Sequence, residues 1–73
     1  MAQLTQRDMA QLTSLAAILR TYEQQYSLSS ADFDARYTSG QAGDSADAFE
    51  WHTLYQMYVR LKEQLAAHGE SAV

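Results

Sequence analysis

Three carboxylates at helical spacing are the first residues of this chain that could do chemistry. Asp44, Asp47 and Glu50 recur at every third position, and such oxygen ligands could bind a divalent cation. The unpaired N–H groups and the dipole of a helix N-terminus attract acids without any metal. The Glu-x-x-His pair of di-iron bundles is also missing, because Phe49 stands three residues before His52. We therefore expect no metal and no cofactor here.

Histidine chemistry has no more support. His52 could act as a general base if another group held it, but the chain has no cysteine and no serine in a recognisable nucleophile motif. A phosphate loop and a nucleophile elbow are absent as well. We predict that His52 faces solvent or an interface and that the protein is not an enzyme.

Composition points to a small folded protein that associates with another chain. The 73 residues are 47% hydrophobic, which is too apolar for a disordered tail but too short for a large core. We expect a single domain over residues 1–73 and a homo-oligomer. The sequence lacks an apolar run of about 20 residues and a secretion signal, so we expect a cytoplasmic protein without membrane contact.

The negative charge is concentrated in the middle of the chain. The formal net charge is −4, and residues 29–50 contain five acids and one base, whereas acids and bases balance elsewhere. This distribution opposes direct contact with nucleic acid and favours a basic protein partner.

Apolar periodicity predicts three helices, hence an all-α fold. Stripes at alternating steps of three and four predict long amphipathic helices at about 6–26 and about 45–67, which can pack antiparallel. We expect them to form a dimeric helical bundle. A short helix at about 30–38 joins them. The stripes consist of Leu12, Leu15, Leu19, Tyr22 and Tyr26 in the first helix, and of Trp51, Leu54, Tyr58, Leu61 and Leu65 in the last, where Tyr55 and Met57 widen it.

Capping signals place the helix ends. Thr5 is the expected N-cap of the first helix, with Leu4 and Met9 as its hydrophobic staple. Ser29 is the expected N-cap of the short helix, which Gly40 should end in a left-handed conformation.

Staple and terminator residues complete the prediction. Leu28 and Phe33 should form the staple of the short helix, with Asp32 at the reciprocal position of its capping box. Gly69 should end the last helix near His68.

Two aromatic residues of the last helix cannot share one face. At 100° per residue, Phe49 lies roughly 160° from Trp51, so Phe49 should meet the short helix, a second copy or a different protein. We predict a partner-binding surface of acids that steer and apolar side chains that anchor, comprising Asp32, Phe33, Asp34, Tyr37, Asp44, Asp47, Phe49, Glu50 and Trp51.

The middle of the chain resembles a group of short bacterial proteins. The resemblance covers roughly residues 22–65 and is carried by a Tyr-x-hydrophobic-Ser-Ser-x-x-Phe segment from Tyr26 to Phe33, a Gly-x-x-Gly-Asp turn from Gly40 to Asp44, and the Glu50-Trp51 pair. Proteins that look like this are often encoded beside a small toxin. The resemblance implies the antitoxin half of a type II toxin-antitoxin pair, with a TumE-type toxin as partner.

The expected function is therefore that of a non-catalytic interaction module, an antitoxin that binds and neutralises a basic toxin. The alternative is a structural subunit of a homo-oligomeric helical bundle without a toxin partner.

Overall fold

Helices make up the regular structure of the protein. In this computed structural model, which describes the backbone of residues 6–71 and the side chains of residues 8–66, α1 spans Gln6–Tyr26, α2 spans Ser30–Thr38 and α3 spans Ala46–Ser71. The described backbone contains no strand. The predicted all-α fold is confirmed, and so are the order of the helices and the bounds of the first two.

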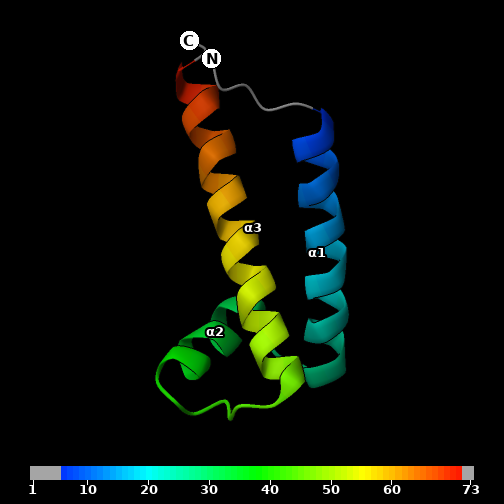
Figure 1. The fold of residues 1–73 in the computed structure, drawn as a ribbon, viewed down its shortest axis with the longest axis vertical. Coiled ribbons are helices and arrows are strands. Elements are labelled where there is room, and N and C mark those ends of the chain that lie inside the picture. Colours follow the sequence, from blue (N-terminus) through cyan, green and yellow to red (C-terminus); the bar gives the residue numbers. More distant parts are fainter. Residues whose placement is uncertain (1–5, 72–73) are drawn as a thin grey trace.

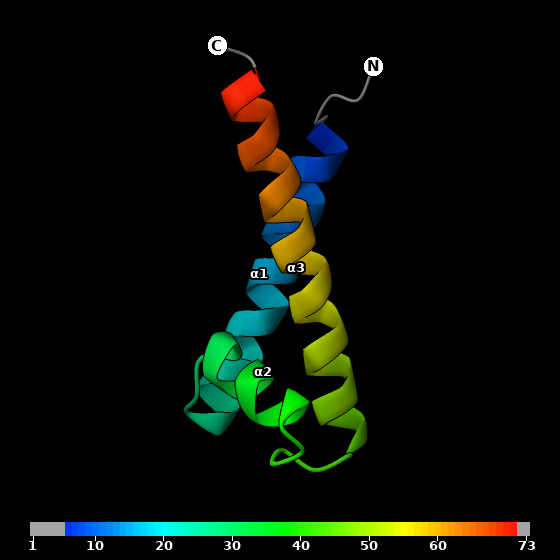
Figure 2. The same ribbon diagram turned by 90° about the vertical axis from the view of Figure 1, so that its left-hand side faces the viewer.

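The long helices form an antiparallel hairpin, and α2 covers one end of it. Figure 1 shows α1 and α3 side by side, with α2 lying against the start of α3. We call this end the elbow; it consists of the end of α1, α2, the link 39–45 and the start of α3. Figure 2 shows that α2 lies to one side of the hairpin, so the other side has no third helix.

Caps at both ends of α2 follow the prediction. The Ser29 hydroxyl accepts a hydrogen bond of 3.1 Å from the Asp32 N–H, and Leu28 packs against the core that contains Phe33. At the other end Gly40 has φ +81°, with N–H bonds from Gly40 to Tyr37 and from Gln41 to the Arg36 carbonyl. This is the Schellman pattern that a left-handed residue makes possible.

The end of α1 uses the same pattern without glycine. Ser27 has φ +53°, and the Leu28 N–H donates to the Glu23 carbonyl at 3.2 Å, as in a Schellman motif. The left-handed region is unfavourable for a residue with a Cβ atom. The predicted break after Tyr26 therefore occurs at a strained serine.

Two predictions about the ends of the long helices change. The last helix does not end near His68; α3 continues to Ser71, because one glycine inside a helix costs only about 1 kcal/mol and does not enforce a stop. Ser45 caps the start of α3 by accepting from the Ala48 N–H at 3.1 Å, so Asp44 precedes the helix. The predicted cap at Thr5 and its Leu4 staple partner lie outside the described residues.

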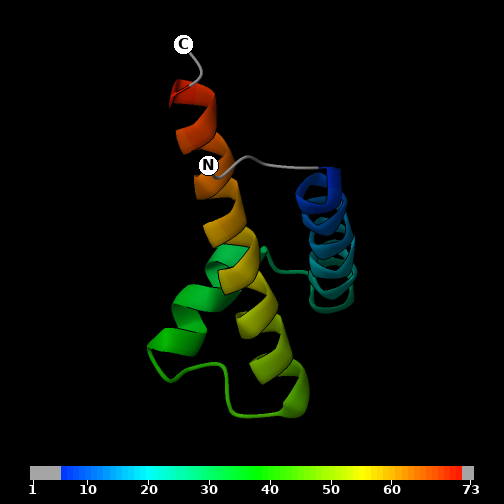
Figure 3. The ribbon, with the colours of Figure 1, turned by 45° about the horizontal axis from the view of Figure 1, so that its top comes forward.

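The core is concentrated at the elbow. Of the described residues, Leu15, Leu19, Phe33, Ala48 and Trp51 are the buried hydrophobic ones, and the last four form one cluster. Farther along the hairpin, Leu12, Leu61 and Leu65 are only half-buried, because α2 does not cover this part of the two long helices. Figure 3 shows that α2 does not extend to that part of α1 and α3.

No helix in the described part of the chain combines the length and the apolar character needed to cross a membrane.

Candidate functional site

The elbow is organised around Trp51, which lies between aromatic rings from the other two helices. Phe33 of α2 stacks on the indole with ring centroids 3.9 Å apart and planes 5° from parallel. Tyr22 and Tyr26 of α1 stack at 5.3 Å and 5.6 Å. Trp51 is 2% exposed, so this one side chain joins all three helices.

A buried hydrogen bond fixes the orientation of the indole. The Trp51 Nε1–H donates to the Ser30 hydroxyl at 2.8 Å, and Ser30 is itself 3% exposed. The Ser30 backbone N–H donates to the Glu23 carboxylate at 2.9 Å. Since Ser30 opens α2, the bond sets the position of α2 against α3.

Beside this stack the elbow contains a half-open pocket of about 240 Å³. We call it the elbow pocket. Its walls are mainly apolar and come from every part of the elbow: Tyr26, Leu28, Phe33, Arg36, Gln41, Ala42, Ser45, Ala48 and Trp51. Small-molecule sites are usually about 300–1,000 Å³. The elbow pocket is therefore better suited to one apolar side chain than to a cofactor.

Charged residues border the elbow pocket. Asp44 lies in the link between two residues of its wall and is exposed. Asp47 accepts a hydrogen bond of 2.8 Å from the Tyr26 hydroxyl, another wall residue. Arg36, the base within residues 29–50, lines the pocket. The pocket thus combines an apolar interior with a mixed but mainly acidic border.

The tyrosines of α1 respond to these acids. The pKa of Tyr22 is raised above its ordinary value by burial of the ring, then by hydrogen bonding to Glu50 and by the negative charges of Glu50 and Asp47. The pKa of Tyr26 is raised mainly by its hydrogen bond to Asp47. Both phenols are held in the neutral form.

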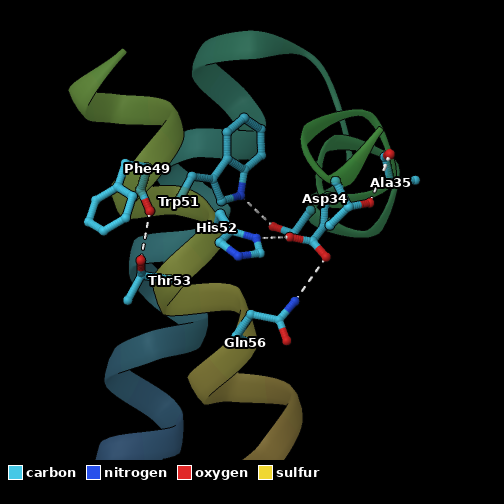
Figure 4. Close-up of polar contacts among 9 residues, drawn as sticks. Asp34, Ala35, Phe49, Trp51, His52, Thr53 and Gln56 are labelled. Carbon is cyan, nitrogen blue, oxygen red and sulfur yellow. Dashed lines mark hydrogen bonds and ion pairs between the residues drawn. The ribbon is translucent and has the colours of Figure 1, made fainter. Parts of the chain in front are cut away.

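A polar network of Asp34, His52 and Gln56 joins α2 to α3 beside the aromatic stack. Asp34 of α2 accepts from the Gln56 amide at 2.9 Å and pairs with the His52 Nδ1 at 2.5 Å, as Figure 4 shows. The His52 ring also stacks on Tyr37 with centroids 4.4 Å apart. His52 therefore contacts its own chain, and the prediction of a histidine facing solvent or an interface is wrong.

The prediction that Asp34 is a partner-binding acid is also wrong. Its side chain is 14% exposed and its two carboxylate oxygens have partners on α3. It therefore belongs to the attachment of α2, whereas the sequence pattern suggested a steering acid on the surface.

The prediction that Phe33 and Trp51 anchor a partner is wrong as well. They are 6% and 2% exposed, so a partner cannot bury their surfaces as anchors, although both still form part of the pocket wall. Tyr37 is half-buried on His52.

Phe49 behaves as its helical position predicts. It is 63% exposed, and in Figure 4 its ring points away from α2. The short helix therefore does not cover Phe49. Asp32, Asp44, Asp47 and Glu50 are also exposed.

Sequence reasoning missed the pairing of His52 with Asp34 and of Trp51 with Ser30. No local signal gives these pairings, because His52 and Glu50 lie about 100° from Trp51 in opposite directions on the helix, and the sequence does not decide which of them the short helix covers.

The histidine and the carboxylates do not converge on a metal-binding arrangement. Among the residues that the structure describes, no three His, Cys, Asp or Glu side chains gather where they could hold an ion.

Comparison with family models, with curated proteins and with solved structures finds no match to this chain.

Proposed function

We propose that this protein is a non-catalytic binding module whose elbow receives a basic protein partner. The observation that carries this proposal is the elbow pocket, a recess of about 240 Å³ with aromatic walls and acids beside it. An interface of this kind gains most of its affinity from one or two side chains seated in a dry pocket. The partner inserts an apolar side chain here and places basic residues near Asp44 and Asp47.

Phe49 supplies a second contact. A phenylalanine that is 63% exposed on the first turn of α3 offers apolar area beside the charged link. Exposed apolar side chains are common singly, so the role proposed for Phe49 rests on its place directly after Ala48, a residue of the pocket wall. In the bound state it packs against the partner while the acids accelerate encounter.

The resemblance to antitoxins supports a toxin as the partner. Under this proposal the protein encoded by the neighbouring gene is basic, arrests growth when expressed alone, and is neutralised by this chain. The localisation that fits this role is the cytoplasm.

The test measures binding of the neighbouring gene's product to the chain by calorimetry, and rescue of growth on co-expression. Ala42→Phe fills the elbow pocket from its wall and should weaken binding at least tenfold, whereas Ala17→Phe, on an exposed part of α1 away from the elbow, should not. Phe49→Ser should weaken binding by about 2 kcal/mol if Phe49 anchors the partner.

Charge reversal tests the steering role separately. Asp44→Lys with Asp47→Lys should slow association about tenfold at low salt and flatten its salt dependence. Absence of a complex, or tight binding by a well-folded Ala42→Phe variant, would show that the elbow pocket is not the binding site.

A further inference from the structure

The side of the hairpin opposite α2 combines apolar and polar residues, and no third helix of the described chain lies over it (Figure 2). Relative to Trp51, the α2-facing residues His52 and Gln56 lie at roughly +100° and +140° on the α3 wheel, whereas Leu61 and Met57 lie at roughly −80° and −120°. Two shallow grooves between α1 and α3 run along this opposite side. We call it the open face; it includes Gln11, Ile18, Glu50, Met57, Arg60 and Leu61.

The open face exposes two large apolar side chains. Ile18 is 41% and Met57 40% exposed. A standard interface buries about 800 Å² on each partner.

The dimensions of the molecule agree with this area. Its extents are 41 × 21 × 18 Å, so one broad face covers on the order of 800 Å², again one partner's share of a standard interface. Two open faces packed together would give four long helices around one core, which is a stable arrangement for helices of this length.

We infer that the open face binds the open face of a second copy, with the two hairpins antiparallel. Charge decides the direction. The net charge of −4 resides within residues 29–50, so parallel hairpins would place two acidic elbows together. Antiparallel hairpins with a two-fold axis on α3 separate the start of one α3 from that of the other by ~24 Å along the helix, which is about three screening lengths.

The same direction pairs opposite charges across the interface. Glu50 and Arg60 are ten residues apart on α3, about 15 Å along the helix axis, so they cannot pair within one chain. No acid among the described side chains forms an ion pair with Arg60. A two-fold axis near the level of Tyr55 sets Glu50 of one copy opposite Arg60 of the second copy, and symmetry repeats the contact.

The first experiment measures the mass of the chain alone by sedimentation from about 1 μM to about 500 μM, a range over which mass action reveals a dimer. The expected mass rises to twice the 8.2 kDa of one chain. Met57→Glu should lower the association constant at least a hundredfold. The matched control Ala35→Glu introduces the same charge at an exposed position of α2, away from the open face, and should leave the dimer unchanged.

The second experiment tests the antiparallel direction of the two hairpins. It changes two exposed residues, Glu50 and Arg60, so the fold should be retained. Glu50→Arg and Arg60→Glu should each weaken the dimer at least tenfold, and the double variant should recover to within about threefold of the original constant, because both cross-chain pairs are restored with reversed sign. Circular dichroism confirms that each variant stays helical.

Three results would overturn the inference: a monomer at every concentration, a folded Met57→Glu variant that dimerises like the original, or a double charge variant as weak as the single ones. The test uses the chain alone, so its outcome is independent of whether the elbow pocket binds a partner.

Discussion

At the scale of single residues, Ser30 and Trp51 contribute more to the stability of the fold than their residue types suggest. The serine hydroxyl is the acceptor for a fully buried indole N–H, and a buried donor without an acceptor is costly. The hydrogen bond therefore matters because of what its loss leaves behind.

Ser30→Ala should destabilise the protein by about 1–3 kcal/mol, since it leaves the Trp51 N–H unpaired inside the core. Chemical denaturation followed by circular dichroism measures the change. Ser14→Ala, at an exposed position within α1, is the matched control and should alter the free energy of unfolding by less than about 0.5 kcal/mol. Equal effects of the two substitutions would contradict a structural role for the Ser30–Trp51 bond.

The tyrosines beside the acids make stability depend on alkaline pH. The folded state raises the pKa of Tyr22 and of Tyr26 above the ordinary value of 10.0, so between the unfolded and folded pKa values the folded protein binds more protons. The stabilising contribution is complete below pH 10 and is lost as the pH rises through the folded pKa values.

Denaturation midpoints measured between pH 8 and pH 11 should therefore fall above about pH 10. Replacing both tyrosines by phenylalanine removes the titrating groups while keeping most of the ring stacking, and should flatten this part of the profile. An unchanged alkaline slope in the double variant would assign it to other groups.

At the scale of elements, two turns solve the same geometric problem with different residues. Gly40 and Ser27 both adopt positive φ after a helix. For Gly40 this conformation is free of strain, whereas a residue with a Cβ atom pays roughly 1 kcal/mol or more for it.

Ser27→Gly should therefore stabilise the protein by about 0.5–1 kcal/mol, and Gly40→Ala should destabilise it by about 1 kcal/mol. A Cβ at Gly40 would meet no atom within 4 Å, so the second effect is purely one of backbone strain. Thermal unfolding of the two variants should shift in opposite directions by several degrees. Shifts of the same sign would refute the shared explanation.

The helices were predictable because their signals are local. Apolar steps of three and four located α1 and α3, and the Ser29 cap and Gly40 located α2, each within a stretch of a few residues. The end of α3 was not, because a single glycine shifts the balance of a helix end only slightly.

The contacts between elements were less predictable. The sequence pattern separated Phe49 from Trp51 correctly, but it could not show on which side of α3 the short helix would lie. The side of α3 on which α2 packs determines the environment of several residues. It buries Phe33, brings Asp34 and His52 into contact, and leaves Phe49 exposed to solvent. Periodicity defines the faces of one helix, whereas the assignment of a face to a neighbour depends on packing across the whole chain.

At the scale of the whole molecule, the two ends of the hairpin differ in construction. The elbow has three helices, a stacked aromatic core and a polar network, whereas the rest of the hairpin has two helices with half-buried leucines. A small domain of this kind gains stability when a second chain completes its core. The proposed dimer and the proposed partner would use adjoining surfaces, because Asp47 lines one groove of the open face and also accepts from Tyr26 of the elbow pocket wall.

The stacked indole also gives the protein an optical sensor of its own. Trp51 is the one tryptophan in the sequence, and it forms part of the elbow pocket wall, with Tyr22 and Tyr26 close enough to transfer excitation to it. Its emission colour and intensity therefore report on this end of the molecule alone. A side chain that enters the elbow pocket should therefore change the intrinsic tryptophan fluorescence, without any dye or label.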